Sequence, residues 1–178
     1  VSQHTAVDVP GLTDVLCGAS RPGHFRGVTT VVSKLLGIVR PHVAAFGAKD
    51  LQQVLVIKKM VRDLSMNTEI EVVPTVRESD GLAMSSRNGY LSHDERALAP
   101  LFSRTLEETA KRVAQLDSNI EAVTAEAKAT LTDAGFVVDY LEARHTYDLS
   151  EASSLNQETA IFGAAFLGTT RLIDNRIV

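Results

Sequence analysis

The spacing of apolar residues in the first half of the chain alternates between two periods. Val and Leu at every third or fourth position predict amphipathic helices, and short apolar runs closed by Gly or Pro predict buried strands. The predicted elements are a helix over 28–39, a buried strand over 43–46, a helix over 50–64 and a strand over 69–73. Because strand, helix and strand in this order are typical of a parallel pair with a right-handed crossover, residues 43–73 predict a βαβ unit.

Two further predictions concern the residues before the first helix. Residues 5–9 alternate in a way that predicts a short strand, which Pro10-Gly11 should stop. The stretch 18–27 contains three glycines and a proline and therefore predicts a loop.

The second half of the chain has the pattern of helices followed by antiparallel strands. Capping boxes at 92–95 and 118–121 should begin two helices, Pro100 should break or kink the first, and Gly135 should end the second. The strands that follow are predicted over 137–144, 159–167 and 170–178. Gly168-Thr169 predicts a hairpin between the last two strands.

A polar stretch from Arg77 to Gly89 separates these two patterns, so we place a domain boundary near residue 75. The predicted fold class is α/β. A parallel-sheet domain over residues 1–75 is followed by a small α+β domain over residues 76–178.

Composition narrows the classes of function. The 178 residues are 44% hydrophobic with a net charge of −4, which gives no electrostatic case for nucleic-acid binding. No apolar stretch reaches the roughly 20 residues of a membrane span. A single cysteine, Cys17, fits a reducing, cytoplasmic location, and the five dispersed histidines predict no metal site. The sequence lacks an initiator Met, and we expect it to be part of a longer protein.

Two candidate sites follow the first predicted strand. In Gly47-Ala48-Lys49-Asp50, the glycine permits close approach of a ligand, the lysine suits a phosphate and the aspartate suits a ribose. The alternative is an N-cap Asp50 beside a surface lysine. Gln52-Gln53 follows, and an amide facing the strand ends suits a hydroxyl or carboxylate of a small substrate. The alternative is that both amides face solvent.

The other two candidate sites are loops. Met84-Ser85-Ser86-Arg87-Asn88 offers hydroxyls, backbone amides and a guanidinium that suit a triphosphate, as in the mobile loop of class I nucleotidyl transferases. The alternative is a flexible interdomain loop. Residues 21–28 place a histidine and two arginines on a glycine-rich stretch, where ordering of the loop is favoured over anion binding. The chain has no Walker A or Gly-x-Gly-x-x-Gly motif.

Taken together, five segments resemble the pantothenate synthetase family, the pantoate–β-alanine ligases, in order and spacing. The segments are 21–28, 46–53, 76–88, 138–142 and 168–175. The resemblance implies a Rossmann-like nucleotide-binding domain and a C-terminal lid domain. It also implies a two-step reaction in which the carboxylate of (R)-pantoate attacks the α-phosphorus of ATP and the amine of β-alanine then displaces AMP, with Mg²⁺ bridging the phosphates.

The resemblance also implies roles for individual residues. The ATP-binding positions would be Gly47, Ala48, Lys49, Asp50, Val76, Met84, Ser85, Ser86 and Arg87. Of these, Lys49, Ser85, Ser86 and Arg87 would be catalytic, and Gln53 would bind pantoate. The family implies a homodimer.

The family also carries a His-x-x-His segment and a second pantoate-binding Gln, which this sequence lacks. We therefore expect the chain alone to be incomplete for catalysis and the first strands of the sheet to be missing. Two alternatives stay open: another class I adenylyl transferase, and a non-catalytic fragment or paralogue that binds a partner. Gln53 together with Phe46-Gly47-x-Lys49-Asp50 argues for the family against the first alternative.

Overall fold

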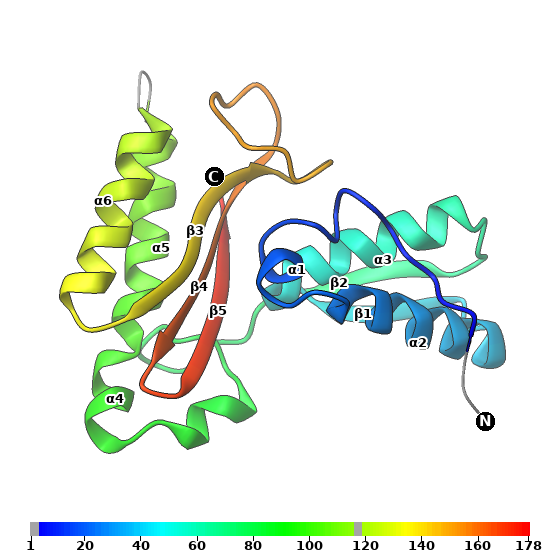
Figure 1. Cartoon of the computed structure of the whole chain (residues 1–178), viewed down its shortest axis with the longest axis horizontal. Coiled ribbons are helices and arrows are strands. Elements are labelled where there is room, and N and C mark those ends of the chain that lie inside the picture. The colour runs from blue at the N-terminus through cyan, green and yellow to red at the C-terminus, as the bar shows by residue number, and fades with distance from the viewer. Residues whose placement is uncertain (1–3, 116–118) are drawn as a thin grey trace. The chain divides into compact units, whose positions relative to one another are not determined.

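The computed structural model of the chain describes residues 4–115 and 119–178. The chain is a mixed α/β protein, as predicted, and divides into two units, Val1–Pro74 and Thr75–Val178 (Figure 1). The first unit contains a parallel pair of strands, and the second contains an antiparallel three-stranded sheet.

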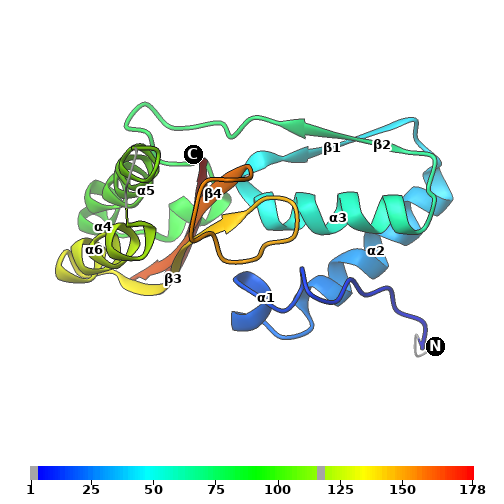
Figure 2. The ribbon, with the colours of Figure 1, turned by 90° about the horizontal axis from the view of Figure 1, so that it is seen from above.

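The first unit is built around a βαβ crossover. Its elements are α1 (Cys17–Ser20), α2 (His24–Val39), β1 (Val43–Gly47), a 3-10 turn (Ala48–Asp50), α3 (Leu51–Asp63) and β2 (Glu69–Val73). β1 and β2 pair in parallel with Gly47 opposite Val73, so the predicted βαβ unit is confirmed. α3 packs on both strands and α2 packs on α3 (Figure 2).

Two predictions near the N-terminus are wrong. Residues 5–9 form no strand, because their backbone bonds to α2: the Val7 N–H donates to Thr30 Oγ1 over 2.9 Å and the Val7 carbonyl accepts from Thr29 Oγ1 over 2.6 Å. The predicted loop over 18–27 is helical at both ends. α2 begins at His24, since Gly23 adopts φ of 79° and ends the turn before it.

The predicted burial of the first unit is also wrong for the described residues. β1 alternates between exposed and half-buried positions, and Val43 is 53% exposed. On α2 the predicted apolar face is divided, because Leu36 is 8% exposed whereas Leu35 is 54% exposed. Hydrophobic spacing identified α2 and the βαβ elements of this unit correctly, but within the described chain they do not enclose a core on every side.

The second unit has two helices on one face of its sheet. Its elements are a 3-10 turn (Ser86–Tyr90), α4 (His93–Leu98), α5 (Pro100–Val113), α6 (Ile120–Asp133), β3 (Val137–His145), β4 (Thr159–Leu167) and β5 (Thr170–Ile177). The strands pair antiparallel in the order β3-β4-β5, and α5 and α6 cover one face (Figure 1). The centre of the core holds Phe102, Leu106, Leu131, Phe136, Leu141 and Ile161.

Local signals in the second unit explain where its helices begin and end. Ser92 and Glu95 form the predicted capping box, and Pro100 occupies the first turn of α5, where a missing N–H costs nothing. Asn119 caps α6 by accepting from the Ala122 N–H, and Gly135 follows that helix with φ of 97°. The Ser118 of the predicted second capping box lies outside the described residues.

The predicted hairpin is confirmed, with Gly168 at its turn and φ of 55°. A Cβ at Gly168 would lie 1.9 Å from Oε1 of Glu95, so the turn lies directly against α4. None of the helices within 4–115 and 119–178 is long and apolar enough to cross a membrane.

Close packing of α5 on β4 leaves no room for a side chain at Gly163. A Cβ there would lie 2.9 Å from Cδ2 of Leu106 and 3.1 Å from Cζ of Phe102. We expect Gly163→Ala to lower the free energy of unfolding by about 1–3 kcal/mol, as overpacking does. Urea denaturation measures this change.

The matched control is Gly37→Ala in α2, where a Cβ would meet nothing within 4 Å. There we expect the free energy of unfolding to rise by about 0.5–1 kcal/mol, because alanine has a higher helix propensity than glycine. A neutral or stabilising Gly163→Ala would contradict the close contact between α5 and β4.

Candidate functional site

The first group of candidate residues lies at the carboxyl end of β1. Gly47 ends the strand in extended conformation, and Ala48–Asp50 form a 3-10 turn that leads into α3. Lys49 is half-buried there and Asp50 is exposed. Because β1 and β2 are parallel, this edge also carries the end of β2 at Val73, and it is the edge at which open parallel sheets bind ligands.

Asp50 occupies the N-cap position of α3, as the alternative interpretation predicted, with φ of −95° and ψ of 51°. Its side chain makes no capping hydrogen bond. Its exposed carboxylate lies beside Lys49 in sequence, which places an acceptor and a cation within the same turn.

The neighbouring glutamines have different environments. Gln52 is 5% exposed, and its Nε2 donates to the carbonyls of Leu12 (2.9 Å) and Val15 (2.8 Å), while its Oε1 accepts from the Cys17 N–H at 3.1 Å. Gln52 thus fixes the segment before α1. Gln53 is half-buried at the start of α3. The alternative that both amides face solvent is wrong for Gln52, and Gln53 is the more accessible of the two.

The second group of candidate residues begins with a small hydrogen-bonded hairpin over residues 76–84. Arg77 and Ala83 form an antiparallel bridge, and the Met84 N–H donates to the Val76 carbonyl over 2.9 Å. Ser85 then caps the next 3-10 turn, because its Oγ accepts from the backbone N–H of Arg87 over 3.2 Å. Met84, Ser86 and Arg87 are exposed. The segment therefore presents a hydroxyl and a guanidinium from a bonded frame.

A carboxylate at the tip of this hairpin is tied to α4. Asp80 Oδ2 accepts from Arg96 Nη1 at 2.6 Å, and Asp80 Oδ1 accepts from the Leu82 N–H. The bond from Arg96, followed by that from Leu82, holds the pKa of the Asp80 carboxyl below its usual range despite partial burial. The carboxylate therefore stays ionised at neutral pH and keeps its bond to α4.

A buried polar cluster lies beneath the hairpin. Arg77 Nη1 and Nη2 donate to Oδ2 and Oδ1 of Asp174 at 2.7 and 3.1 Å, and Arg176 Nη1 donates to Oδ2 at 3.0 Å. Ser103 Oγ accepts from Arg176 Nη2 at 2.7 Å and donates to the Gly81 carbonyl at 2.8 Å. One residue of the hairpin is thereby bonded to β5 and another to α5.

Sequence reasoning assigned no role to this cluster. Arg77 and Asp174 both lie within segments of the family resemblance, 76–88 and 168–175. Their placement was the signal in the sequence that could have revealed the cluster, because opposite charges in two motif segments suggest a contact between these segments.

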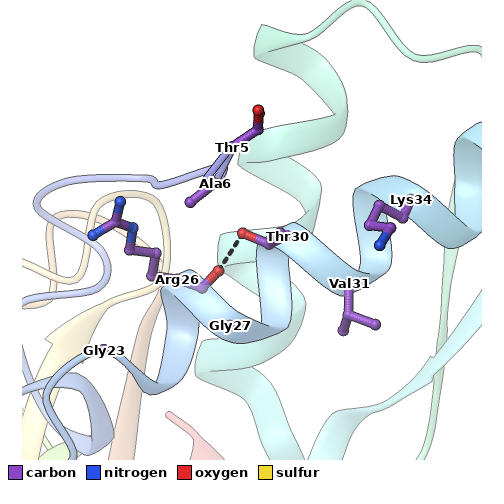
Figure 3. Close-up of a pocket in the computed structure, with 8 residues that line it drawn as sticks. All are labelled: Thr5, Ala6, Gly23, Arg26, Gly27, Thr30, Val31 and Lys34. Atoms are coloured by element: carbon purple, nitrogen blue, oxygen red, sulfur yellow. Dashed lines mark hydrogen bonds between the residues drawn. The ribbon is translucent and has the colours of Figure 1, made fainter. Parts of the chain in front are cut away.

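The loop over 21–28 makes local contacts. Arg21 Nη1 lies 3.2 Å from His24 Nε2, and the His24 and Phe25 rings are in contact. These contacts support the interpretation that the segment orders itself. A cavity of about 370 Å³ lies beside α2, with Arg26 and Lys34 among its lining residues (Figure 3). No residue predicted to bind ATP lines it.

The structure thus brings together the candidate residues of each unit. Gly47, Lys49, Asp50 and Gln53 lie at one strand end in the first unit, and Met84 to Arg87 lie on one loop in the second. Within the described parts of the chain, no group of three or more His, Cys, Asp or Glu side chains could hold a metal ion.

The fold defines an α/β protein in which the candidate residues Gly47, Lys49, Asp50 and Gln53 lie at the carboxyl end of a parallel strand pair. The particular family is identified by the model for Pantoate-beta-alanine ligase, which matches residues 2–177, and the chain belongs to that family. The resemblance found in the sequence is confirmed.

Relatives agree with this assignment. A pantothenate synthetase from Shewanella sp. (strain ANA-3) is 57% identical over 175 residues, which are 98% of this chain and 62% of the relative. One from Hahella chejuensis (strain KCTC 2396) is 53% identical over the same share of each chain. The chain therefore spans less than two thirds of the length of the curated relatives it matches.

Two solved structures are similar to the chain. Pantothenate synthetase from Thermus thermophilus has a TM-score of 0.90 and 42% identity, covering 97% of this chain and 63% of that one. The pantoate–β-alanine ligase from Francisella tularensis, solved with beta-gamma ATP and beta-alanine, has a TM-score of 0.73 and 34% identity. The match covers 98% of this chain and 58% of that one.

The two adjacent glutamines give a direct test of the first site's frame. Gln52→Ala removes three hydrogen bonds, two to the segment before α1 and one to Cys17 at its start, and two of the three are buried. We expect the free energy of unfolding to fall by about 1–3 kcal/mol.

Gln53→Ala is the matched control, because it removes the same side chain one position along α3. There we expect a change within about 0.5 kcal/mol. Chemical denaturation of both variants measures the difference, and equal losses would show that Gln52 does not anchor the segment.

Proposed function

We propose that this chain supplies ATP-binding and pantoate-binding residues for the condensation of (R)-pantoate with β-alanine. The observation that carries the proposal is the strand-end cluster of Gly47, Lys49, Asp50 and Gln53 on a parallel βαβ unit in a member of this ligase family. The similar ligase from Francisella tularensis was solved in complex with beta-gamma ATP and beta-alanine, which supports ATP and β-alanine as substrates.

The proposed reaction has two steps. A carboxylate oxygen of pantoate attacks the α-phosphorus of ATP, and the bond to the pyrophosphate oxygen breaks, giving pantoyl adenylate and pyrophosphate. The amine of β-alanine then attacks the acyl carbon, releases AMP and loses a proton. Because both nucleophiles belong to substrates, the protein supplies orientation and positive charge rather than a nucleophilic side chain.

Each residue of the first group has a role that suits its position. Gly47 lets the nucleotide approach the backbone closely, and Ala48 lies next to it in the same turn. The half-buried Lys49 faces the growing negative charge of the phosphates, and the exposed Asp50 accepts from ribose hydroxyls. Gln53 donates to pantoate. Its neighbour Gln52 takes no part in binding, because its amide is already bonded to the backbone.

The second group serves the triphosphate. The Ser86 hydroxyl and the Arg87 guanidinium are exposed, and Ser85 and Met84 offer backbone groups on the same turn. A guanidinium is suited to phosphate oxygens because it donates two parallel bonds. The Val76 backbone, at the root of this hairpin, is proposed to contact adenine.

Mg²⁺ is proposed to arrive as part of the ATP complex. A magnesium ion held mainly by phosphates and water needs few protein carboxylates. We also propose that the protein is a homodimer and lies in the cytoplasm, as the sequence leads us to expect. We propose further that these 178 residues alone do not complete the reaction.

The decisive experiment measures AMP release from ATP, pantoate and β-alanine, with Mg²⁺ present. The complete open reading frame that encodes this chain is assayed beside the 178-residue chain. We expect AMP to appear only with both pantoate and β-alanine, and only from the complete reading frame. Adenylate formation that another acid supports better than pantoate would favour a different adenylyl transferase, and no ATP response from either protein would favour a binding module.

Variants at the first site separate the two substrates. We expect Gln53→Ala to raise the KM for pantoate about tenfold, which corresponds to one lost hydrogen bond, with the KM for ATP unchanged. Lys49→Ala should lower kcat/KM for ATP by about 100-fold, since it removes a cation facing the phosphates. Steady-state kinetics of the complete reading frame measure both.

Lys58→Ala is the control for Lys49, because Lys58 is exposed on α3, the helix that follows the turn of Lys49, and lies further from the strand end in sequence. It should leave both constants within about twofold of the unaltered enzyme. Equal effects of the two lysine substitutions would contradict the assignment of Lys49 to the phosphates.

A further inference from the structure

We propose that Asp174 is a positioning residue that fixes the loop Met84–Arg87 through Arg77. This inference rests on the proposed function, in which that loop contacts the triphosphate. Asp174 lies on β5 and Arg77 at the base of the hairpin that carries the loop, 97 residues apart in sequence.

The Asp174 carboxylate is buried, and both of its oxygens accept hydrogen bonds. Its side chain is 1% exposed, and its two oxygens accept from both guanidinium nitrogens of Arg77. Oδ2 also accepts from Arg176, and Oδ1 accepts from the Asn175 N–H over 2.8 Å. A paired contact of this kind fixes the direction of the arginine as well as its distance.

The same cluster reaches a second point on the hairpin. Arg77 Nη1 donates to the Gly81 carbonyl over 3.2 Å, and Ser103 on α5 donates to that carbonyl as well. Gly81 adopts φ of 90° at the turn of the hairpin. The hairpin is therefore fixed at its base by β5 and at its turn by α5.

The position of the hairpin determines where the loop Met84–Arg87 begins, because the loop continues directly from it. Ala83 pairs with Arg77 across the bridge, and the next residue, Met84, donates its N–H to Val76. Asn88 Nδ2 then donates to the Ala83 carbonyl over 3.1 Å, so the loop is bonded to the hairpin at both of its ends. A shift of Arg77 must move Met84 and the start of the loop with it.

Stability alone is a poor reason for such a cluster. Desolvating one carboxylate with two guanidinium groups costs much of what their attraction returns. The Asp139–Arg171 pair is a second ion pair of the same sheet and joins β3 and β5, with Arg171 Nη2 2.6 Å from Asp139 Oδ2. Asp139→Asn is therefore a matched control for Asp174→Asn.

The first arm of the test needs no ligand. Hydrogen exchange of the Met84 amide is measured in the 178-residue chain carrying Asp174→Asn, Arg77→Lys or Asp139→Asn. We expect protection of that amide to fall about tenfold or more in the first two and to be unchanged in the control, because local opening follows the lost contacts. Arg77→Lys keeps a positive charge, and it decides the question if Asp174→Asn lowers the folded fraction.

The second arm measures kinetics in the complete reading frame, corrected for the folded fraction. Asp174→Asn should lower kcat/KM for ATP by about 100-fold, the cost of a small displacement of catalytic groups, and leave the KM for pantoate unchanged. Asp139→Asn should match the unaltered enzyme. A purely structural role would lower the amount of active protein and leave kcat/KM for ATP per folded molecule intact.

Failure of the positioning role can be distinguished from failure of the proposed function. Exchange and kcat/KM that are the same in the Asp174→Asn and Asp139→Asn variants would overturn the positioning role while the unaltered enzyme still released AMP. An unaltered enzyme without AMP release would instead overturn the proposed function, and the exchange arm would still decide whether Asp174 fixes the loop.

Discussion

Parallel pairing of β1 with β2 is the constraint on which the candidate site depends. Parallel neighbours cannot be joined by a tight turn, so the chain must cross over, and here α3 makes the crossing. The start of α3 must therefore follow the carboxyl end of β1. That requirement places Lys49 and Gln53 at the edge where β2 also ends. The two side chains need not contact each other for this.

Buried polar side chains then fix the segments around these elements. Gln52 binds groups 35 to 40 residues away in sequence, and Asp174 binds Arg77 97 residues away as well as its neighbours Asn175 and Arg176. Each satisfies nearly all of its hydrogen-bonding capacity inside the protein. Such groups are costly to bury unless every partner is in place. They therefore specify one arrangement of the chain more strongly than an apolar contact of the same size.

The fold was predictable where the signal is local. The break at Pro100, the capping box at Ser92 and the hairpin turn at Gly168 each follow from the chemistry of a few adjacent residues, and all three are present. The strand predicted over 5–9 was not found, because alternation in a short segment does not reveal whether its backbone partner is a strand or the hydroxyls of a helix. Burial of β1 was wrong for a related reason, since a pattern identifies an apolar face but not what covers it.

The candidate site was predictable as a set of residues and not as a geometry. Motif order marked Lys49 and singled out Gln53, but residue type alone did not reveal that the amide of the neighbouring Gln52 is bonded to the backbone. The same limit applies to Arg77, whose position in a motif suggests a contact with another motif segment but does not give the geometry of its pairing with Asp174, 97 residues away. A reaction whose nucleophiles both belong to substrates depends on how accurately donors and cations are placed. In the proposed function, the residues that hold the loops therefore matter as much as those proposed to contact ATP.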